Sequence, residues 1–192
     1  LTHHIEAFCS PLYHPMSCGV AVEGVRLIQQ HLPAAYADGQ DLLAREGMLV
    51  ASAMAAVAFQ KGLGGVHALA HPLGARFHKH HGLLNAILLP YVMVANREVI
   101  SRDIARLARY LELPQPDFEG FVQWVLQLRR QLAIPHTLHE IGLDADVADW
   151  VGEQAVADIS SSDTNAQPLD AHAYSQIYRN AVHGDLPAVF RQ

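Results

Sequence analysis

The sequence predicts an all-α fold, a helical bundle that forms one domain over residues 1–192. Three observations support this prediction. Apolar residues recur three and four positions apart along most of the chain, which is the period of one helix face. No segment of any length alternates apolar and polar residues as a half-buried strand does. Aspartates, glycines and prolines divide the pattern into short segments, while no linker or internal repeat separates the chain into domains.

The first part of the chain predicts nearly uncharged helices. The expected elements are a helix over 1–8, a loop over 10–15, a helix over 18–30, a turn over 37–41 and a helix over 42–60. Asp38 or Asp41 is the expected N-cap of the last of these helices. Because this helix is apolar on all sides past Glu46, we expect it to be buried inside the bundle.

The middle of the chain contains glycines and prolines that limit the helices. Gly62, Gly64 and Gly65 end the preceding helix. The expected elements that follow are a short helix over 67–77, interrupted at Pro72, and an apolar helix over 83–94, which Pro90 bends or splits.

The second half of the chain is more amphipathic and more charged. The expected elements are helices over 98–111, 117–132, 144–158 and 170–184, a short turn-helix over 134–142 and a polar loop over 160–168. Asp117 and Asp170 are the expected N-caps of two of these helices, and Asp144 or Asp146 that of a third.

Composition excludes several classes of function. The formal net charge of −6 is unlike the basic footprint of a nucleic-acid-binding protein or a basic membrane patch. No run of about 18 uninterrupted apolar residues occurs, so we expect no membrane-spanning helix. Two cysteines cannot build a disulfide framework, which fits the reducing cytosol. Charged residues make up only 17% of the chain, whereas a globular average is roughly 25%.

The start of the chain is apolar and periodic from its first residue. Leu1 enters a helical pattern with no capping residue ahead of it and no signal-peptide pattern. We therefore expect this helix to begin upstream and the chain to be part of a longer protein.

Histidine is the unusual residue type, with 13 in 192. His67 and His71 are four residues apart, which places both imidazoles on one helix face about 6 Å apart along the axis. His81 follows 14 residues after His67 and stands directly before Gly82. Clustered neutral imidazoles suit a divalent transition metal. The alternatives to a metal site are two histidines that are buried in the core with their hydrogen bonds satisfied, or two histidines on a solvated helix face.

The sequence lacks features that a zinc protease site and a nucleotide-binding loop require. In a zinc protease helix, the residue that acts as the base would occupy position 68, which is Ala68. The glycines at 62, 64 and 65 lie between helices and do not follow a strand, so they are not a nucleotide-binding loop.

Three segments carry a family resemblance. Residues 1–8 (LTHHIEAF), 64–74 (GGVHALAHPLG) and 81–86 (HGLLNA) together resemble the iron-containing, group III alcohol dehydrogenases. The resemblance extends over the whole chain. It implies a two-domain enzyme, in which an N-terminal α/β domain binds the nicotinamide cofactor and a C-terminal helical domain of the dehydroquinate synthase-like type holds the metal. The chain resembles only the helical domain, so the nucleotide-binding domain is expected to be absent from it.

The resemblance also implies roles for individual residues. His3, His67 and His81 match the family's metal-binding histidines, although His80 is a competing choice for the last of them. The aspartate that completes the family's ligand set would stand two residues before Leu1. His71 matches a histidine beside the active site and is the implied catalytic neighbour. Phe59 is expected on the substrate side of the cleft.

The implied activity is the interconversion of an alcohol and an aldehyde or ketone by hydride transfer. The implied cofactors are a divalent metal, Fe²⁺ or alternatively Zn²⁺, and NAD or NADP bound through the missing domain. We expect a cytoplasmic homodimer or larger assembly that binds a small alcohol or aldehyde, no nucleic acid and no membrane, and we expect the chain alone to be inactive. The alternatives are a zinc-dependent relative of the glycerol dehydrogenase or dehydroquinate synthase type, and a non-catalytic helical interaction domain.

Overall fold

The computed structural model describes residues 1–190 and confirms the all-α prediction, since no strand occurs among these residues. The α-helices are α1 (Thr2–Cys9), α2 (Pro15–Ala37), α3 (Leu42–Ala58), α4 (Gly65–Phe77), α5 (His81–Ala95), α6 (Arg97–Tyr110), α7 (Phe118–Gln131), α8 (Ala148–Ala157), α9 (Ile159–Ser162) and α10 (Ala171–His183). The short 3₁₀ helices are η1 (Phe59–Lys61), η2 (His139–Ile141), η3 (Ala145–Val147) and η4 (Ala188–Phe190).

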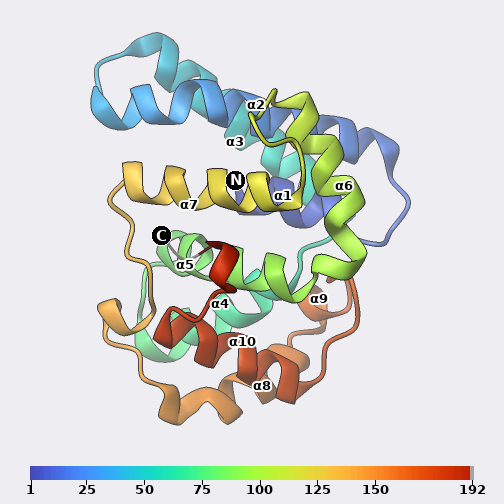
Figure 1. Ribbon diagram of the computed structural model, residues 1–192, viewed down its shortest axis with the longest axis vertical. Helices are drawn as coiled ribbons and strands as arrows, with labels where there is room; N and C mark the ends of the chain where they lie inside the picture. Colours follow the sequence, from blue (N-terminus) through green and yellow to red (C-terminus); the bar gives the residue numbers. More distant parts are fainter. Residues whose placement is uncertain (191–192) are drawn as a thin grey trace.

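The helices pack around a central helix, α5. Figure 1 shows α2 and α3 side by side at one end of the molecule and α8 and α10 together at the other. Helix α5 packs against α4, α7 and α10, and nearly all its residues between Leu84 and Met93 are buried. Helix α1 packs against α2 and α3 and also reaches α5. The N-terminal helix is therefore placed where its side chains can meet those of α4 and α5.

Most of the predicted caps are confirmed. The side chains of Asp41, Asp117 and Asp170 accept hydrogen bonds from the first turns of α3, α7 and α10. Neither Asp144 nor Asp146 caps α8, because a 3₁₀ turn precedes that helix and its cap position makes no side-chain hydrogen bond. The predicted polar loop over 160–168 was wrong in part, since α9 occupies its first residues.

Helix α2 is longer than the predicted helix over 18–30. It begins at Pro15, whose fixed φ suits the first position of a helix. The imidazole Nδ1 of His14 accepts a hydrogen bond from the backbone N–H of Ser17 at 3.1 Å and so acts as the N-cap. The loop predicted over 10–15 therefore ends one residue earlier than expected, at this cap.

The predicted interruption at Pro72 was wrong, and Pro90 does not split its helix, because both prolines lie inside continuous helices. A proline in a helix interior costs about 3 kcal/mol through its lost hydrogen bond and its ring contact. Burial of the residues around it offsets this cost here. Pro90 itself is buried, and Leu69 and Leu73 beside Pro72 are fully buried.

The prediction that α3 is buried inside the bundle was also wrong. Small residues, including Gly47 and Ala51, form its buried face against α2. Its large apolar residues point outward, and Leu49 is 74% exposed. Composition shows that a helix is apolar on all sides, but only its neighbours determine how much of its surface they cover.

The segment Leu42–Lys61, which comprises α3 and η1, is long and apolar enough to cross a membrane by length and composition alone. It is only 22% buried. It also carries Arg45 and Glu46, and it packs along α2 within the bundle. A single helix of this kind is a weak indication of a membrane segment.

Candidate metal centre

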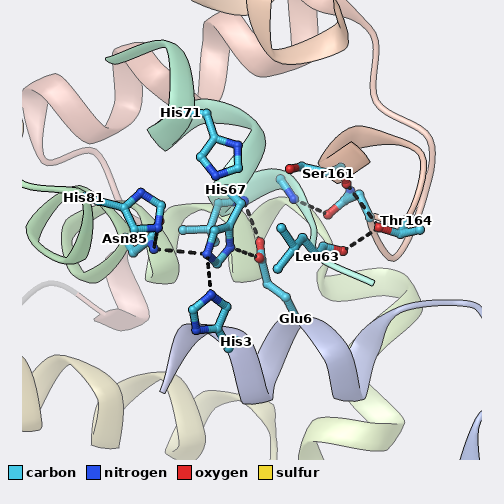
Figure 2. A network of polar contacts seen from close by, with 12 residues as sticks. His3, Glu6, Leu63, His67, His71, His81, Asn85, Ser161 and Thr164 are labelled. Carbon is cyan, nitrogen blue, oxygen red and sulfur yellow. Dashed lines mark hydrogen bonds and ion pairs between the residues drawn. The ribbon is translucent and has the colours of Figure 1, made fainter. Parts of the chain in front are cut away.

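Three helices bring His3, His67 and His81 together (Figure 2). The ring of His67 lies 4.6 Å from that of His3 and 5.2 Å from that of His81, measured between centroids. The Nε2 atoms of His3 and His67 are 3.1 Å apart. His67 is almost completely buried, at 1% exposure. The three histidines that the resemblance implied as ligands are therefore neighbours in space, although 78 positions separate the first from the last.

Glu6 contacts the side of the His67 ring that faces away from the other histidines. Its Oε2 lies 2.5 Å from Nδ1 of His67, and its Oε1 accepts a hydrogen bond from the backbone N–H of Val66 at 2.7 Å. A proton on Nδ1 donates to this carboxylate, so Nε2 presents its lone pair toward the other histidines. Carboxylate partners of this kind fix the orientation and raise the basicity of histidines that bind metals.

Asn85 lies between two of the imidazoles. Its Nδ2 is 3.2 Å from Nε2 of His67 and 3.0 Å from Nε2 of His81, and it donates toward both (Figure 2). The side chain is buried, and its Oδ1 has no hydrogen-bond partner. The Nε2 lone pairs of His67 and His81 therefore converge on one small region.

The first turn of α4 is fixed by side chains from distant segments. Oδ1 of Asn165 accepts a hydrogen bond from the backbone N–H of Gly65 at 3.0 Å, as Glu6 does from Val66. These two acceptors satisfy amides that have no partner within the helix. A Cβ at Gly64 would come within 2.9 Å of Oε1 of Glu6, so glycine permits this close approach. His67 follows in the same turn and is held with it.

Burial favours the neutral form of the His3 and His81 imidazoles. Burial, followed by the neighbouring His67, lowers the pKa of His3 to about 4. Burial likewise lowers the pKa of His81, with further contributions from His67 and His71. The neutral imidazole is the form that binds metals.

The start of α5 gives His80 and His81 different surroundings. Nδ1 of His80 accepts a hydrogen bond from the backbone N–H of Leu83 at 3.3 Å, so His80 is the N-cap. His81 is the first residue of the helix, and its ring stacks at 5.4 Å from that of His71.

The other two predicted site residues border the same cluster. His71 lies one turn after His67 on α4, and their ring centroids are 5.6 Å apart. Nδ1 of His71 is 2.7 Å from Oδ2 of Asp158. Phe59, at the start of η1, has its ring 5.1 Å from that of His3. All five residues singled out from the sequence therefore lie together.

Imidazole nitrogens are a donor set that suits a divalent transition ion. Ligand nitrogens at about 2.1 Å from one ion lie about 3 to 3.4 Å apart, and the Nε2 atoms of His3 and His67 are separated by 3.1 Å. Within residues 1–190, however, no group of three or more His, Cys, Asp or Glu side chains is placed so that it could hold a metal ion. The Nε2 atoms of His3 and His67 lie within hydrogen-bonding distance of each other, and Asn85 lies within that distance of Nε2 of both His67 and His81.

Sequence reasoning missed three residues of this site. Glu6 lies three residues after His3, and Asn85 lies four residues after His81. These are spacings that put side chains on one helix face, so helical periodicity could have found both. Asp158 is 87 residues from His71 and carries no local signal.

Residues 1–182 match the family model described as the Fe-containing alcohol dehydrogenase family, C-terminal. The chain belongs to the iron-containing alcohol dehydrogenase family. The predicted membership and the predicted helical domain of that family are both confirmed.

Relatives in this family include both fungal and bacterial proteins. Alcohol dehydrogenase 4 of Saccharomyces cerevisiae is 38% identical over 161 residues, which cover 82% of this chain and 42% of the yeast protein. The 4-hydroxybutyrate dehydrogenase of Cupriavidus necator is 36% identical over 191 residues, covering 95% of this chain and 49% of its own length.

Solved structures of the family share the fold. The crystal structure of a 1,3-propanediol oxidoreductase matches with a TM-score of 0.88 and 30% identity, over 94% of this chain and 49% of that protein. The iron-containing alcohol dehydrogenase from Thermococcus thioreducens matches with a TM-score of 0.86 and 28% identity, over 96% and 49%. The chain thus spans about half the length of the curated relatives it matches.

Proposed function

We propose that this chain is the helical, metal-binding half of an alcohol dehydrogenase that interconverts an alcohol and an aldehyde or ketone with NAD or NADP. His3, His67 and His81 hold a divalent ion in this proposal, with Fe²⁺ as the first choice and Zn²⁺ as the alternative. The observation that carries the proposal is the convergence of these three imidazoles, with the Nε2 atoms of two of them 3.1 Å apart.

The chain's residues divide the work of the reaction. A bound divalent ion supplies Lewis acidity, which lowers the pKa of an alcohol hydroxyl or polarises a carbonyl. His67, fixed by Glu6, and His81, at the start of α5, would hold this ion together with His3. Phe59 supplies an apolar wall beside His3. His71 stands next to the ligands and takes the hydroxyl proton.

A nicotinamide cofactor would supply the hydride acceptor for the substrate carbon, and we propose that a separate α/β half of the enzyme would bind it. Relatives about twice as long as this chain have room for such a half. The substrate and cofactor meet in a cleft between the two halves, where water is excluded.

Metal binding is the decisive test. We expect the chain to bind Fe²⁺ under anaerobic conditions, or Zn²⁺, in calorimetric titration, and we expect His67→Ala to weaken binding at least 100-fold. His172→Ala on the exposed surface of α10 is the matched control and should bind as the unaltered chain does. Equal affinity in both variants would contradict the proposed ligands. A folded chain that binds neither ion would favour the interaction-domain alternative.

We expect the chain by itself to be inactive, because the proposed nicotinamide site lies outside these residues. An assay with NADH or NADPH and an aldehyde should show no turnover. Turnover would contradict the proposal that the nicotinamide site lies outside these residues.

We also propose a cytosolic homodimer or larger assembly, since both cysteines are free and large apolar residues of α3 are exposed. Sedimentation velocity measures the assembly state, and a monomer at all concentrations would argue against it.

A further inference from the structure

His71 belongs to a second hydrogen-bonded array that the proposed metal ligands do not use. Nδ1 of His71 lies 2.7 Å from Oδ2 of Asp158, and Oδ1 of Asp158 accepts a hydrogen bond from Oγ of Ser160 at 2.6 Å. The two carboxylate oxygens thus have different partners. His71 comes from α4, whereas Asp158 and Ser160 lie where α8 passes into α9.

The backbone around Asp158 holds this carboxylate in place. The carbonyl oxygen of Asp158 accepts hydrogen bonds from the amides of Ser161 and Ser162 at 3.0 and 2.9 Å. The side chain of Asp158 is 19% exposed and that of His71 is 40% exposed. Burial on its own raises the pKa of Asp158, but hydrogen bonds from Ser160 and His71 outweigh it, so the net pKa lies below its usual value.

An ionised carboxylate can only accept hydrogen bonds, which decides the tautomer of His71. Its proton lies on Nδ1 and donates to Oδ2 of Asp158, so Nε2 carries a lone pair. Figure 2 shows the ring of His71 above the cluster, with one ring nitrogen directed toward His67 and His81. Because Nδ1 is bound to Asp158, the nitrogen on the cluster side is Nε2.

We propose that Asp158 is a positioning residue that keeps His71 in its Nδ1–H tautomer, so that Nε2 is open to take the hydroxyl proton of the alcohol. This inference rests on the proposed function. In the step, the O–H bond of the alcohol breaks and an N–H bond forms at Nε2 of His71. The positive charge of the resulting imidazolium lies next to the negative charge of Asp158. The arrangement resembles that of catalytic histidines in other enzymes, in which an aspartate bonded to Nδ1–H fixes the tautomer of the ring.

Ser160 makes the proposal sharply testable. In Asp158→Asn, the amide oxygen keeps the hydrogen bond from Ser160, so the NH₂ group faces Nδ1 of His71. Nδ1 must then accept, and the proton moves to Nε2. Long-range ¹H–¹⁵N correlation spectra of the ¹⁵N-labelled chain, recorded at alkaline pH, distinguish the two tautomers. We expect His71 to change from mainly Nδ1–H to mainly Nε2–H in this variant.

The double variant Asp158→Asn with Ser160→Ala releases the amide, which can then turn its oxygen toward Nδ1. We expect the Nδ1–H tautomer of His71 to be recovered at least in part. Asp144→Asn is the matched control, since Asp144 bonds Nδ1 of His139 at 3.1 Å in an exposed pair. This variant should leave the His71 signals unchanged. The signals of His67, which bonds Glu6, should remain constant throughout.

Two outcomes would overturn the inference. One is an Nε2–H tautomer of His71 in the unaltered chain, which needs no variant to fold. The other is an unchanged Nδ1–H tautomer in a folded Asp158→Asn chain. Both readouts are independent of metal binding, so failure of the metal titration with the expected tautomers would reject the proposed function alone. Metal binding with the wrong tautomer would reject the role of Asp158 alone.

Discussion

Glu6 connects His67 of α4, a proposed metal ligand, with the helix that carries His3. One carboxylate oxygen accepts a hydrogen bond from His67 and the other accepts one from the backbone amide of Val66. A single buried side chain therefore orients a proposed ligand and also satisfies an amide in the first turn of the helix that carries it. The carboxylate also adds negative charge beside the cluster of imidazoles. No other acidic side chain contacts Nδ1 of His67 among the described residues.

Replacing Glu6 with glutamine tests this arrangement. The amide keeps the shape of the side chain but removes the charge and offers only one acceptor oxygen for two donors. We expect the affinity for Fe²⁺ or Zn²⁺ to fall about 10- to 100-fold, the usual effect of losing such an outer carboxylate. Calorimetric titration measures it. Glu23→Gln on α2, whose carboxylate pairs with Arg26, is the control, and a loss of the same size there would refute the specific role of Glu6.

At the level of helices, His4 fixes the position of α1. The ring is fully buried, and its Nε2–H donates to the carbonyl oxygen of Ala51 on α3 at 3.0 Å. The same ring lies against Gly24 of α2, where an added Cβ would be 2.0 Å from it. His31 of α2 lies against Gly47 of α3 in the same way. Glycines thus let imidazole rings pack between these helices, and the adjacent His3 is placed as a result.

Two glycines of α2 make a matched pair of substitutions. Gly24→Ala forces the new methyl group into His4, and we expect a loss of about 1–3 kcal/mol in the free energy of unfolding. Gly19→Ala meets no atom within 4 Å, and alanine in an open helical position stabilises by about 0.5–1 kcal/mol. Denaturant unfolding followed by circular dichroism gives both values. Equal effects at the two positions would show that His4 does not limit the packing.

At the level of the whole molecule, a pair of asparagines joins segments that are far apart in sequence. The side chains of Asn96 and Asn165 exchange two hydrogen bonds, of 2.9 and 3.0 Å. Asn165 also accepts from Gly65 and donates to the carbonyl oxygen of Gln167. The junction of α5 and α6, the start of α4 and the segment before α10 therefore meet at one buried point.

Removal of this junction should affect both stability and the metal site. Asn165→Ala leaves the amide of Gly65 and the side chain of Asn96 without partners in a buried place, which costs about 2–4 kcal/mol in total. We also expect weaker metal binding, because the turn that carries His67 loses one of its two side-chain acceptors. Gln176→Ala, which removes one exposed hydrogen bond to Asn180, is the control. A stability change below that of this control would contradict the role of the junction.

Sequence patterns were enough to predict the helical class, most helix positions, the family and the five residues that meet at the cluster. Periodicity and caps act over a few residues, so local sequence is sufficient for them, as Asp41 and Asp117 show. The spacing of His67 and His71 likewise determines which face they share.

The packing of the helices against one another determines which surfaces are covered and which distant side chains meet. Periodicity does not reveal that Leu49 is exposed or that the helix containing Pro90 continues, because neighbouring helices determine both. The carboxylate of Glu6 contacts His67, which is 61 positions away in the sequence, and that of Asp158 contacts His71, which is 87 positions away. Such pairs depend on how the helices pack against one another, which is a property of the whole folded chain.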